Sequence, residues 1–286
     1  MKNKYFRQIL LDFMQWLERL NYAKGSVRSR TRQLKKFLCW LEEKGINRLE
    51  EVSGNELKLY NEMLHQQPYN YRTIQGYVSV FKLLNEYLES YGEAPMIKVK
   101  LAVVKGIRTE RRVLSVEEIS KLYETCEGTF MGKRDRIILA VYYGCGLRSR
   151  EGIRLEVNDV DFNNGLLHVR MGKNYRERYV PLSDGVRREL YDWIEGGLRY
   201  FSGGKTSVLL PTQNGGRLQN SSLNKRLKVL CKKANVEEVS LHNLRHSIAT
   251  HLLTSGMELE KISQFLGHKG LEATQIYTRI LNQEDG

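Results

Sequence analysis

Six residues in the C-terminal half of this 286-residue chain belong to types that can bind, protonate and attack a phosphodiester. They are Arg148, Lys173, His242, Arg245, His268 and Tyr277. Arginine can fork onto two phosphate oxygens, histidine and lysine can donate protons or hydrogen bonds, and a tyrosine hydroxyl can be a nucleophile. If the fold brings them together, they form a phosphoryl-transfer site that needs neither a metal ion nor another cofactor.

Arg148 follows Gly146 and Leu147 at the end of an apolar run, L-A-V-Y-Y-G, which predicts that a helix ends just before it. Glu151 stands three residues further on, close enough to hold the guanidinium or a neighbouring group in place. Pairs of arginine and glutamate are common on helix surfaces, so this string is a weak signal when taken alone.

A second helix is predicted to start at the string S-L-H-N-L-R-H-S-I-A-T-H-L-L, which contains His242 and Arg245. These two residues are three positions apart and share one helical face. At a helix start, where the dipole also favours anions, such a pair predicts a phosphate cradle. The buried stripe of this helix is predicted to consist of Leu241, Leu244, Ile248 and Leu252.

The histidines of this helix also permit a metal site, since His242 and His246 are four residues apart and His251 follows. The string lacks the glutamate of an H-E-x-x-H site, and Arg245 between the ligands would repel a cation. Hydrogen-bonding roles for His246 and His251 are therefore favoured, and no metal site is expected.

Lys173 lies in M-G-K-N-Y-R-E-R-Y-V-P-L, at the tip of a predicted β-hairpin, where a side chain could reach a leaving oxygen. Its ammonium could act as the general acid that protonates this oxygen. Arg170, Arg176 and Arg178 compete for the role, but arginine is a poor proton donor. A solvated basic turn is the alternative, and the pattern alone leaves it open.

His268 and Tyr277 complete the set in L-G-H-K-G-L-E-A-T-Q-I-Y-T. An isolated tyrosine near a C-terminus is usually a packing residue, and only its place in this motif favours a nucleophile. A phosphotyrosyl ester keeps the energy of the broken phosphodiester for religation, so such a reaction would need no ATP.

In order and spacing these strings resemble the motifs of the tyrosine site-specific recombinases, most closely the bacterial Xer-like branch, over nearly the whole chain. The resemblance implies an N-terminal helical core-binding domain and a C-terminal α+β catalytic domain that clamp double-stranded DNA. It also implies that Tyr277 attacks the phosphate activated by the other five residues, leaving a 3′-phosphotyrosyl link and a free 5′-hydroxyl, with Glu151 as the supporting acid.

The same resemblance implies that four protomers assemble on paired inverted-repeat sites, either as a homo-tetramer or as a tetramer with a second recombinase. The DNA strands are then expected to pass through a Holliday junction. Integration and excision, inversion, and dimer resolution all share this active site. Only nine residues follow Tyr277, so exchange of C-terminal tails between protomers is expected to use a short segment if it occurs. The chemical alternative is a type IB topoisomerase-like enzyme, which religates a cleaved strand to itself. A catalytically silent DNA-binding protein is disfavoured because all six residues are present.

The elements that must position these residues predict a mainly α fold with a small antiparallel β-sheet. Helices are expected up to about residue 90, one capped by Ser26, the next by a capping box of Ser53 and Glu56, and the fourth at residues 71–90. Another capping box, Ser115 with Glu118, precedes helical runs near 115–126 and 131–144. Turns at 164–165 and 172–175 predict β-hairpins. The chain after them is predicted to be helical, with glycine breaks near 203–204 and 215–216.

The domains are predicted at residues 1–97 and 113–286, with a basic linker at 98–112. In the helix expected after Ser26, an apolar stripe leaves basic residues on other faces, either solvated or in contact with a phosphate backbone. The predicted DNA contacts are Arg28, Arg32, Lys35, Lys36, Arg72, Lys105 and Arg108.

The overall composition agrees with a polyanionic partner, since 46 basic and 33 acidic residues give a net charge of +13. Residues 1–105 hold 18 basic and 11 acidic residues, so both parts of the chain are basic. The four scattered cysteines predict reduced thiols in a cytoplasmic protein. A signal peptide is not expected, because Asp12 and Gln15 interrupt the N-terminal apolar run. A membrane span is not expected either, because no apolar stretch elsewhere reaches the roughly 20 residues that it needs.

Overall fold

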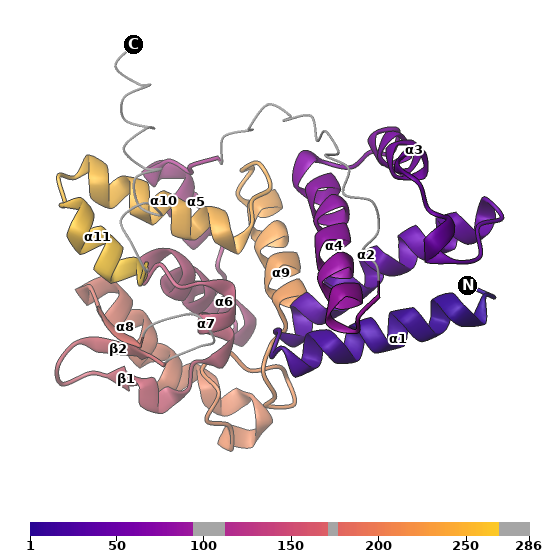
Figure 1. The fold of residues 1–286 in the computed structure, drawn as a ribbon. Coiled ribbons are helices and arrows are strands. Elements are labelled where there is room, and N and C mark those ends of the chain that lie inside the picture. The colour runs from indigo at the N-terminus through magenta and orange to yellow at the C-terminus, as the bar shows by residue number, and fades with distance from the viewer. Residues whose placement is uncertain (94–111, 171–176, 269–286) are drawn as a thin grey trace, which may run out of the picture. The chain divides into compact units, whose positions relative to one another are not determined.

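A computed structural model describes residues 1–93, 112–170 and 177–268 of the chain (Figure 1). The chain divides into two compact units, Met1–Thr109 and Glu110–Gly286, and each unit is described by itself. The division falls inside the predicted linker at residues 98–112, nearly all of which lies outside the described residues. The boundaries of the two domains therefore stay a prediction.

The N-terminal unit is helical throughout its described part. Its helices are α1 (Lys4–Arg19), α2 (Lys24–Glu43), the short 3-10 turn η1 (Leu49–Glu51), α3 (Gly54–His65) and α4 (Tyr71–Ser90). Short polar side chains start three of them: Asn3 and Asn70 accept hydrogen bonds from the first turns of α1 and α4, and Ser53 with Glu56 forms the predicted capping box of α3. The prediction for the fourth helix is confirmed over its whole length.

The predicted start of α2 is wrong. The helix begins at Lys24 with Ala23 as its N-cap, and the backbone N–H of Ser26 donates to the carbonyl of Ala23 at 2.7 Å. Ser26 is therefore inside the first turn, where its preference for the cap position does not decide the boundary.

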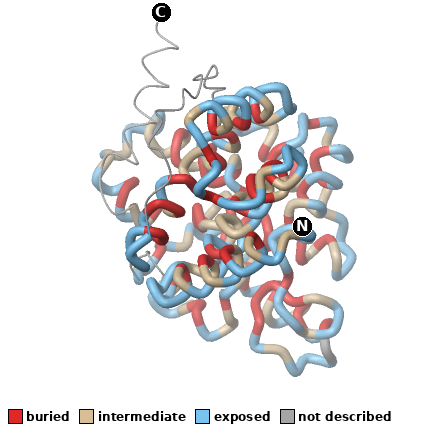
Figure 2. Tube along the Cα trace, turned by 45° about the vertical axis from the view of Figure 1, so that its right-hand side comes forward, coloured by how far each residue is buried: buried red, intermediate tan, exposed pale blue. Residues whose placement is uncertain are grey.

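The core of the N-terminal unit forms where α2 packs against α1 and α4. The apolar stripe predicted for α2 consists of Val27, Thr31, Leu34, Leu38 and Leu41, and all of these are buried except Thr31, which is half-buried. Figure 2 shows this alternation of buried and exposed positions along the helices. Aromatic rings fill the centre, with Phe37 edge-on to Tyr60 and to Phe81 at centroid distances of 4.9 and 4.7 Å. Such ring pairs add specific geometry to the hydrophobic burial.

The C-terminal unit combines helices with a small sheet. Its α-helices are α5 (Val116–Glu124), α6 (Phe130–Leu139), α7 (Ser149–Arg154), α8 (Asp184–Asp192), α9 (Asn220–Lys233), α10 (Leu241–Thr254) and α11 (Leu259–Leu266). Two π-helical turns, η2 (Ala140–Gly144) and η4 (Trp193–Gly197), continue α6 and α8, and 3-10 turns lie at η3 (Val157–Asp159), η5 (Leu198–Tyr200) and η6 (Ser202–Gly204). The capping box of Ser115 and Glu118 is present at the start of α5, as predicted.

The sheet has three antiparallel strands in the order β1 (Val160–Asp161), β2 (Leu166–Val169) and β3 (Arg178–Pro181). The predicted hairpin between β1 and β2 exists, but its connection has four residues instead of two, because Asp161 pairs with Leu166. Only Gly165 has a positive φ there, and Asn164 instead donates its backbone and side-chain N–H groups to Asp161. An aspartate-centred turn replaces the expected Asn-Gly turn. The turn predicted at residues 172–175 lies outside the described residues.

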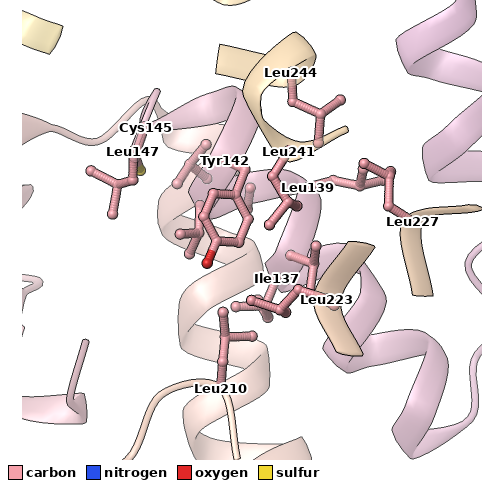
Figure 3. Close-up of a cluster of buried hydrophobic side chains, with 14 of the residues drawn as sticks. Ile137, Leu139, Tyr142, Cys145, Leu147, Leu210, Leu223, Leu227, Leu241 and Leu244 are labelled. Carbon is pink, nitrogen blue, oxygen red and sulfur yellow. The ribbon is translucent and has the colours of Figure 1, made fainter. Parts of the chain in front are cut away.

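The core of the C-terminal unit surrounds the end of α6 and the turn η2. Figure 3 shows Tyr142 among leucines that come from distant parts of the chain, including Leu210 and Leu241. Because α10 packs against η2, α9 and α11, it is buried on more than the one predicted stripe. Arg245, His246 and Ser247 are buried, whereas Ile248 and Leu252 are only half-buried.

None of the four cysteines is in a disulfide, and all lie in described segments: Cys145 and Cys231 are buried, Cys39 and Cys126 half-buried. Among the residues that the structure describes, no helix has both the length and the apolar character needed to cross a bilayer.

Candidate active site

Arg148 is the N-cap residue of α7, directly after the loop that follows η2. Its Nη1 donates to Oε1 of Glu151 at 2.9 Å, and its backbone N–H donates to Oε2 of the same carboxylate at 2.8 Å. The predicted proximity of Glu151 and the guanidinium is therefore present. The carboxylate caps the helix and fixes the side chain of Arg148 at the same time.

The loop before Arg148 approaches the end of α11 so closely that only glycine fits at position 146. Gly146 has a φ of +60°, and a Cβ atom there would lie 2.9 Å from Cε1 of Phe265. Its carbonyl accepts a hydrogen bond of 2.6 Å from Nη1 of Arg245. The glycine thus lets α7, α10 and α11 converge on one point.

Arg245 points into the protein from α10. Its side chain is 2% exposed, and its Nη2 donates to the carbonyl of Leu266 at 2.7 Å. His242 is one turn earlier on the same helix and is exposed. Of the two residues of the predicted cradle, His242 is therefore exposed, whereas Arg245 lies deep in the site, because α10 packs against η2 and α11 on that side.

The C-terminal end of α11 is the point that the arginines share. Gly267 ends the helix in the left-handed conformation with a φ of +64°, and the backbone N–H of His268 donates to the carbonyl of Ser263 at 3.0 Å. The carbonyl of Leu266 accepts from both Arg245 and Arg148, and that of Gly267 accepts from Nη2 of Arg148 at 2.9 Å. Helix C-termini carry partial negative charge, so cations stabilise this end and orient His268 behind it.

Arg178 on β3 belongs to the same cluster, although the sequence suggested it only as a weaker alternative to Lys173. Its Nη1 and Nη2 donate to the two carboxylate oxygens of Glu151 at 3.1 and 3.0 Å, and its Nε donates to the carbonyl of Phe265 at 3.0 Å. One signal could have placed it: strand alternation puts Arg178 on the same face as Val180, which is buried.

The charges of the cluster set the protonation of its two titratable groups. Burial by itself raises the pKa of Glu151, but the hydrogen bonds and charge of Arg178, together with the hydrogen bonds from Arg148, lower it below its ordinary value. Burial and the positive charges of Arg245, Arg148 and Arg178 lower the pKa of His268 to about 4. At neutral pH the site therefore contains an ionised carboxylate and a neutral imidazole.

Several predicted site residues fall outside the described residues: Lys173, Tyr277, Lys105 and Arg108. Of the predicted DNA contacts that the structure describes, Arg28, Arg32, Lys35 and Arg72 are exposed. Lys36 is half-buried, since its Nζ donates to the hydroxyl of Tyr69 at 2.6 Å and lies 4.5 Å from the centre of that ring.

The structure also describes the two other histidines of α10, His246 and His251. The Nδ1 atom of His251 is 2.9 Å from the hydroxyl of Tyr143, which confirms the predicted hydrogen-bonding role of His251, and His246 is buried. Within residues 1–93, 112–170 and 177–268, no three histidine, cysteine or acidic side chains are grouped so that they could hold a metal ion.

The chain is similar to known proteins both in sequence and in fold. Residues 112–284 match the sequence pattern of the phage integrase family. The chain is 29% identical over 277 residues to the tyrosine recombinase XerC of Oceanobacillus iheyensis, which covers 94% of this chain and 90% of that protein. It is 30% identical over 281 residues to the tyrosine recombinase XerA of Pyrococcus furiosus, covering 98% and 92%. The crystal structure of the XerH site-specific recombinase bound to difH substrate, a pre-cleavage complex, superposes with a TM-score of 0.74 at 20% identity, covering 95% of this chain and 83% of that one.

Proposed function

Because the chain belongs to the phage integrase family, as a tyrosine recombinase of the Xer-like branch, we propose that it cuts DNA with Tyr277 and exchanges strands through a Holliday junction. Tyrosine recombinases are enzymes that cleave and rejoin DNA in site-specific recombination, and the chain shares that activity. The identity of the nucleophile, the junction and the assembly are the parts that we propose.

One observation carries the proposal. The guanidinium groups of Arg148 and Arg245, which are 97 positions apart in the sequence, both donate to the carbonyl oxygen of Leu266, at 3.4 and 2.7 Å. Two arginines that reach one neutral oxygen can also reach one phosphate, which is a stronger acceptor because it is charged. Such donors stabilise the negative charge that develops at the phosphorus in the transition state.

In the proposed reaction, each catalytic side chain has one role. The hydroxyl oxygen of Tyr277 attacks the phosphorus, the bond from phosphorus to the 5′ oxygen breaks, and Lys173 donates a proton to that oxygen. We assign the acceptance of the phenolic proton to His268, whose imidazole is kept neutral at pH 7 by burial and by the nearby arginines, which lower its pKa. His242 hydrogen-bonds the phosphate from the exposed start of α10. The protein keeps the ester energy in the 3′-phosphotyrosyl link, so that the reaction needs neither ATP nor a metal ion.

We further propose that the helical N-terminal unit (residues 1–97) and the catalytic unit (113–286) hold the duplex between them, joined by the basic linker. Four protomers would then pair two inverted-repeat sites in the cytoplasm, as a homo-tetramer or with a second recombinase. Support comes from the similar proteins solved on DNA, among them XerH with difH and the Tn1549 integrase with transposon right-end DNA. Integration and excision, inversion, and dimer resolution are all compatible outcomes.

The proposal is tested by capturing covalent adducts. The protein is incubated with fragments of host genomic DNA and denatured with detergent, and the DNA that stays attached is sequenced beside a Tyr277→Phe control. We expect adducts at one or a few inverted-repeat sites in the wild type and none in the variant, with DNA affinity within a few-fold. Adducts at scattered sites would favour topoisomerase-like cleavage. Adducts formed by the variant would rule out Tyr277 as the nucleophile.

A further inference from the structure

Arg178 joins three segments of the site. Its guanidinium holds both carboxylate oxygens of Glu151 on α7 and the carbonyl of Phe265 on α11, while its backbone belongs to β3. The side chain is 8% exposed, less than the 22% of Arg148. An arginine in this position can hydrogen-bond to other groups of the protein, but little of its side chain is accessible to DNA.

Arg178 has both of its Nη atoms on the carboxylate of Glu151, whereas Arg148 gives that carboxylate only its Nη1. Arg148 and Arg245 also donate to the carbonyls of Leu266, Gly267 and Gly146, which are neutral acceptors. A phosphate between these arginines would compete for the same N–H groups and would be the stronger acceptor. The carbonyls at the end of α11 would then lose part of their hydrogen bonding, while the bond from Arg178 to Phe265 would stay.

We propose that Arg178 is a positioning residue, which keeps Glu151 and the end of α11 in place while Arg148 and Arg245 exchange backbone carbonyls for phosphate oxygens. The inference rests on the proposed function, since it assigns Arg178 a part in that same reaction. Through Glu151 it orients Arg148, and through Phe265 it orients the turn that presents His268.

The packing around Gly267 supports this role. A Cβ atom at Gly267 would lie 2.8 Å from Nη1 and 2.9 Å from Cδ of Arg178. The guanidinium therefore lies against the backbone of the turn that leads directly into His268. Because protein interiors transmit small displacements, a shorter or differently shaped side chain at 178 would let this turn move.

The charges around Glu151 predict how the loss of Arg178 would depend on pH. The carboxylate is faced by Arg148 at the start of α7, Arg178 on β3, Arg245 on α10 and Tyr142 in η2, with His268 after α11 as the remaining titratable neighbour. Without Arg178, the largest of the interactions that lower the pKa of Glu151 would be lost, and this pKa would rise. Protonation would then weaken its hold on Arg148 as the pH falls.

The first test measures single-turnover cleavage of a duplex that carries a site recovered by adduct capture, with a nick that traps the cleaved product. We expect Arg178→Gln to cleave about 10- to 100-fold more slowly than wild type, as is typical when a supporting partner of a site residue is removed. The defect should grow as the pH falls, whereas DNA affinity should stay nearly unchanged. Arg178→Lys should recover part of the rate. Cleavage by Arg178→Gln at the wild-type rate, or a defect independent of pH, would overturn the inference.

Arg136→Gln is the matched control. Arg136 makes a comparable fork with Glu189, its Nε lying 2.9 and 2.8 Å from the two carboxylate oxygens, but it holds no residue of the proposed site. This variant should cleave at the wild-type rate. An equal loss in both variants would mean that any missing arginine fork impairs the fold, which would contradict a specific role for Arg178.

A second test needs no DNA and separates the two proposals. Thermal unfolding of Arg178→Gln, Glu151→Gln and the double variant forms a cycle in which the double variant should lose less Tm than the sum of the single losses. Additive losses would show that Arg178 does not act through Glu151. If the wild type formed no adduct with any DNA, the proposed function would fail, and this cycle would still decide whether the two side chains are coupled.

Discussion

The arginines exposed on α2 of the N-terminal unit and the arginines around Glu151 in the C-terminal unit are used in opposite ways. On α2 of the N-terminal unit, Arg28 and Arg32 are exposed, and the apolar residues of the same helix form the core beneath them. In the C-terminal unit, the side chains of Arg178 and Arg245 are 8% and 2% exposed and converge on one carboxylate, that of Glu151. The same residue type is solvated at Arg28 and Arg32 and desolvated around Glu151.

Exposed and buried arginines differ in the free energy needed to hold the side chain in place and in how closely its position is fixed. An exposed arginine needs no fixed partner, contributes little to stability and can meet a polyanion in many geometries. A buried arginine loses its hydration and must be compensated by a charge or by well-placed acceptors, which here are Glu151 and the carbonyls that end α11. The exposed set is therefore suited to affinity, and the buried set to holding one phosphate in one geometry.

The largest expected effect comes from replacing a buried arginine by lysine. In Arg245→Lys or Arg148→Lys the charge stays, but an ammonium cannot fork two oxygens, so cleavage should fall about 100- to 1000-fold with little change in DNA affinity. Single-turnover cleavage and a binding titration measure the two quantities. Arg32→Lys on the exposed surface is the control and should leave both unchanged. Near-normal cleavage by both buried variants would refute the proposal that Arg148 and Arg245 together hold the phosphate.

The next effect concerns the carboxylate that the buried arginines share. Glu151→Gln removes the negative charge facing three arginines and should cost about 3–5 kcal/mol of unfolding free energy, the usual result of breaking a buried ion pair. Urea unfolding of the full chain measures it. Glu189→Gln, which breaks the more exposed pair with Arg136, should cost about 1 kcal/mol or less. Equal costs would mean that the burial of Glu151 has no energetic consequence.

A smaller effect should appear in the pH dependence of stability. Because the pKa of His268 is about 4 in the folded protein and 6.5 in its ordinary state, the unfolded chain binds a proton between these values that the folded chain does not. Stability should therefore fall as the pH drops from about 6.5 to 4, and be unaffected by this group above 6.5. His268→Gln should lose less stability over that window than wild type. Parallel curves for the two proteins would contradict the shifted pKa.

The smallest effect is expected on the exposed surface of the N-terminal unit. Arg28→Gln, Arg32→Gln or Lys35→Gln should each weaken DNA binding modestly and reduce the slope of log affinity against log salt by about 0.9 for each phosphate that is no longer neutralised. The cleavage rate of bound DNA should not change. Lys82→Gln is the control, because Lys82 is exposed on α4 and pairs with Glu86. Identical slopes for all variants would remove these residues from the DNA interface.

The parts of the fold with strong local signals could be predicted from the sequence. Helix α4 extends over the predicted residues because Asn70 and the apolar spacing both define it, and the capping boxes at Ser53 and Ser115 are also local. The proximity of Arg148 and Glu151 follows from three residues of sequence. Where two local signals competed, as at the start of α2 and in the turn before β2, the prediction was wrong by a few residues.

The interior of the site could not be predicted in the same way, because its contacts are distant in the sequence. Arg178 meets Glu151 across 27 positions, and Arg245 meets Gly146 across 99. Whether an arginine points inward depends on acceptors that only the packed α11 supplies. Motif spacing predicts which residues take part, while the partners that orient them come from tertiary structure.

The most direct test of the account is to locate the DNA link by mass spectrometry. Adducts captured from the wild type would be digested with nuclease and trypsin, and the peptide that carries a nucleotide 3′-phosphate would be sequenced. The chain has 16 tyrosines, but the tryptic peptide at residues 270–279 contains only Tyr277. The account predicts the nucleotide on this peptide, attached to Tyr277. A nucleotide on any other tyrosine, or on a serine, would contradict it.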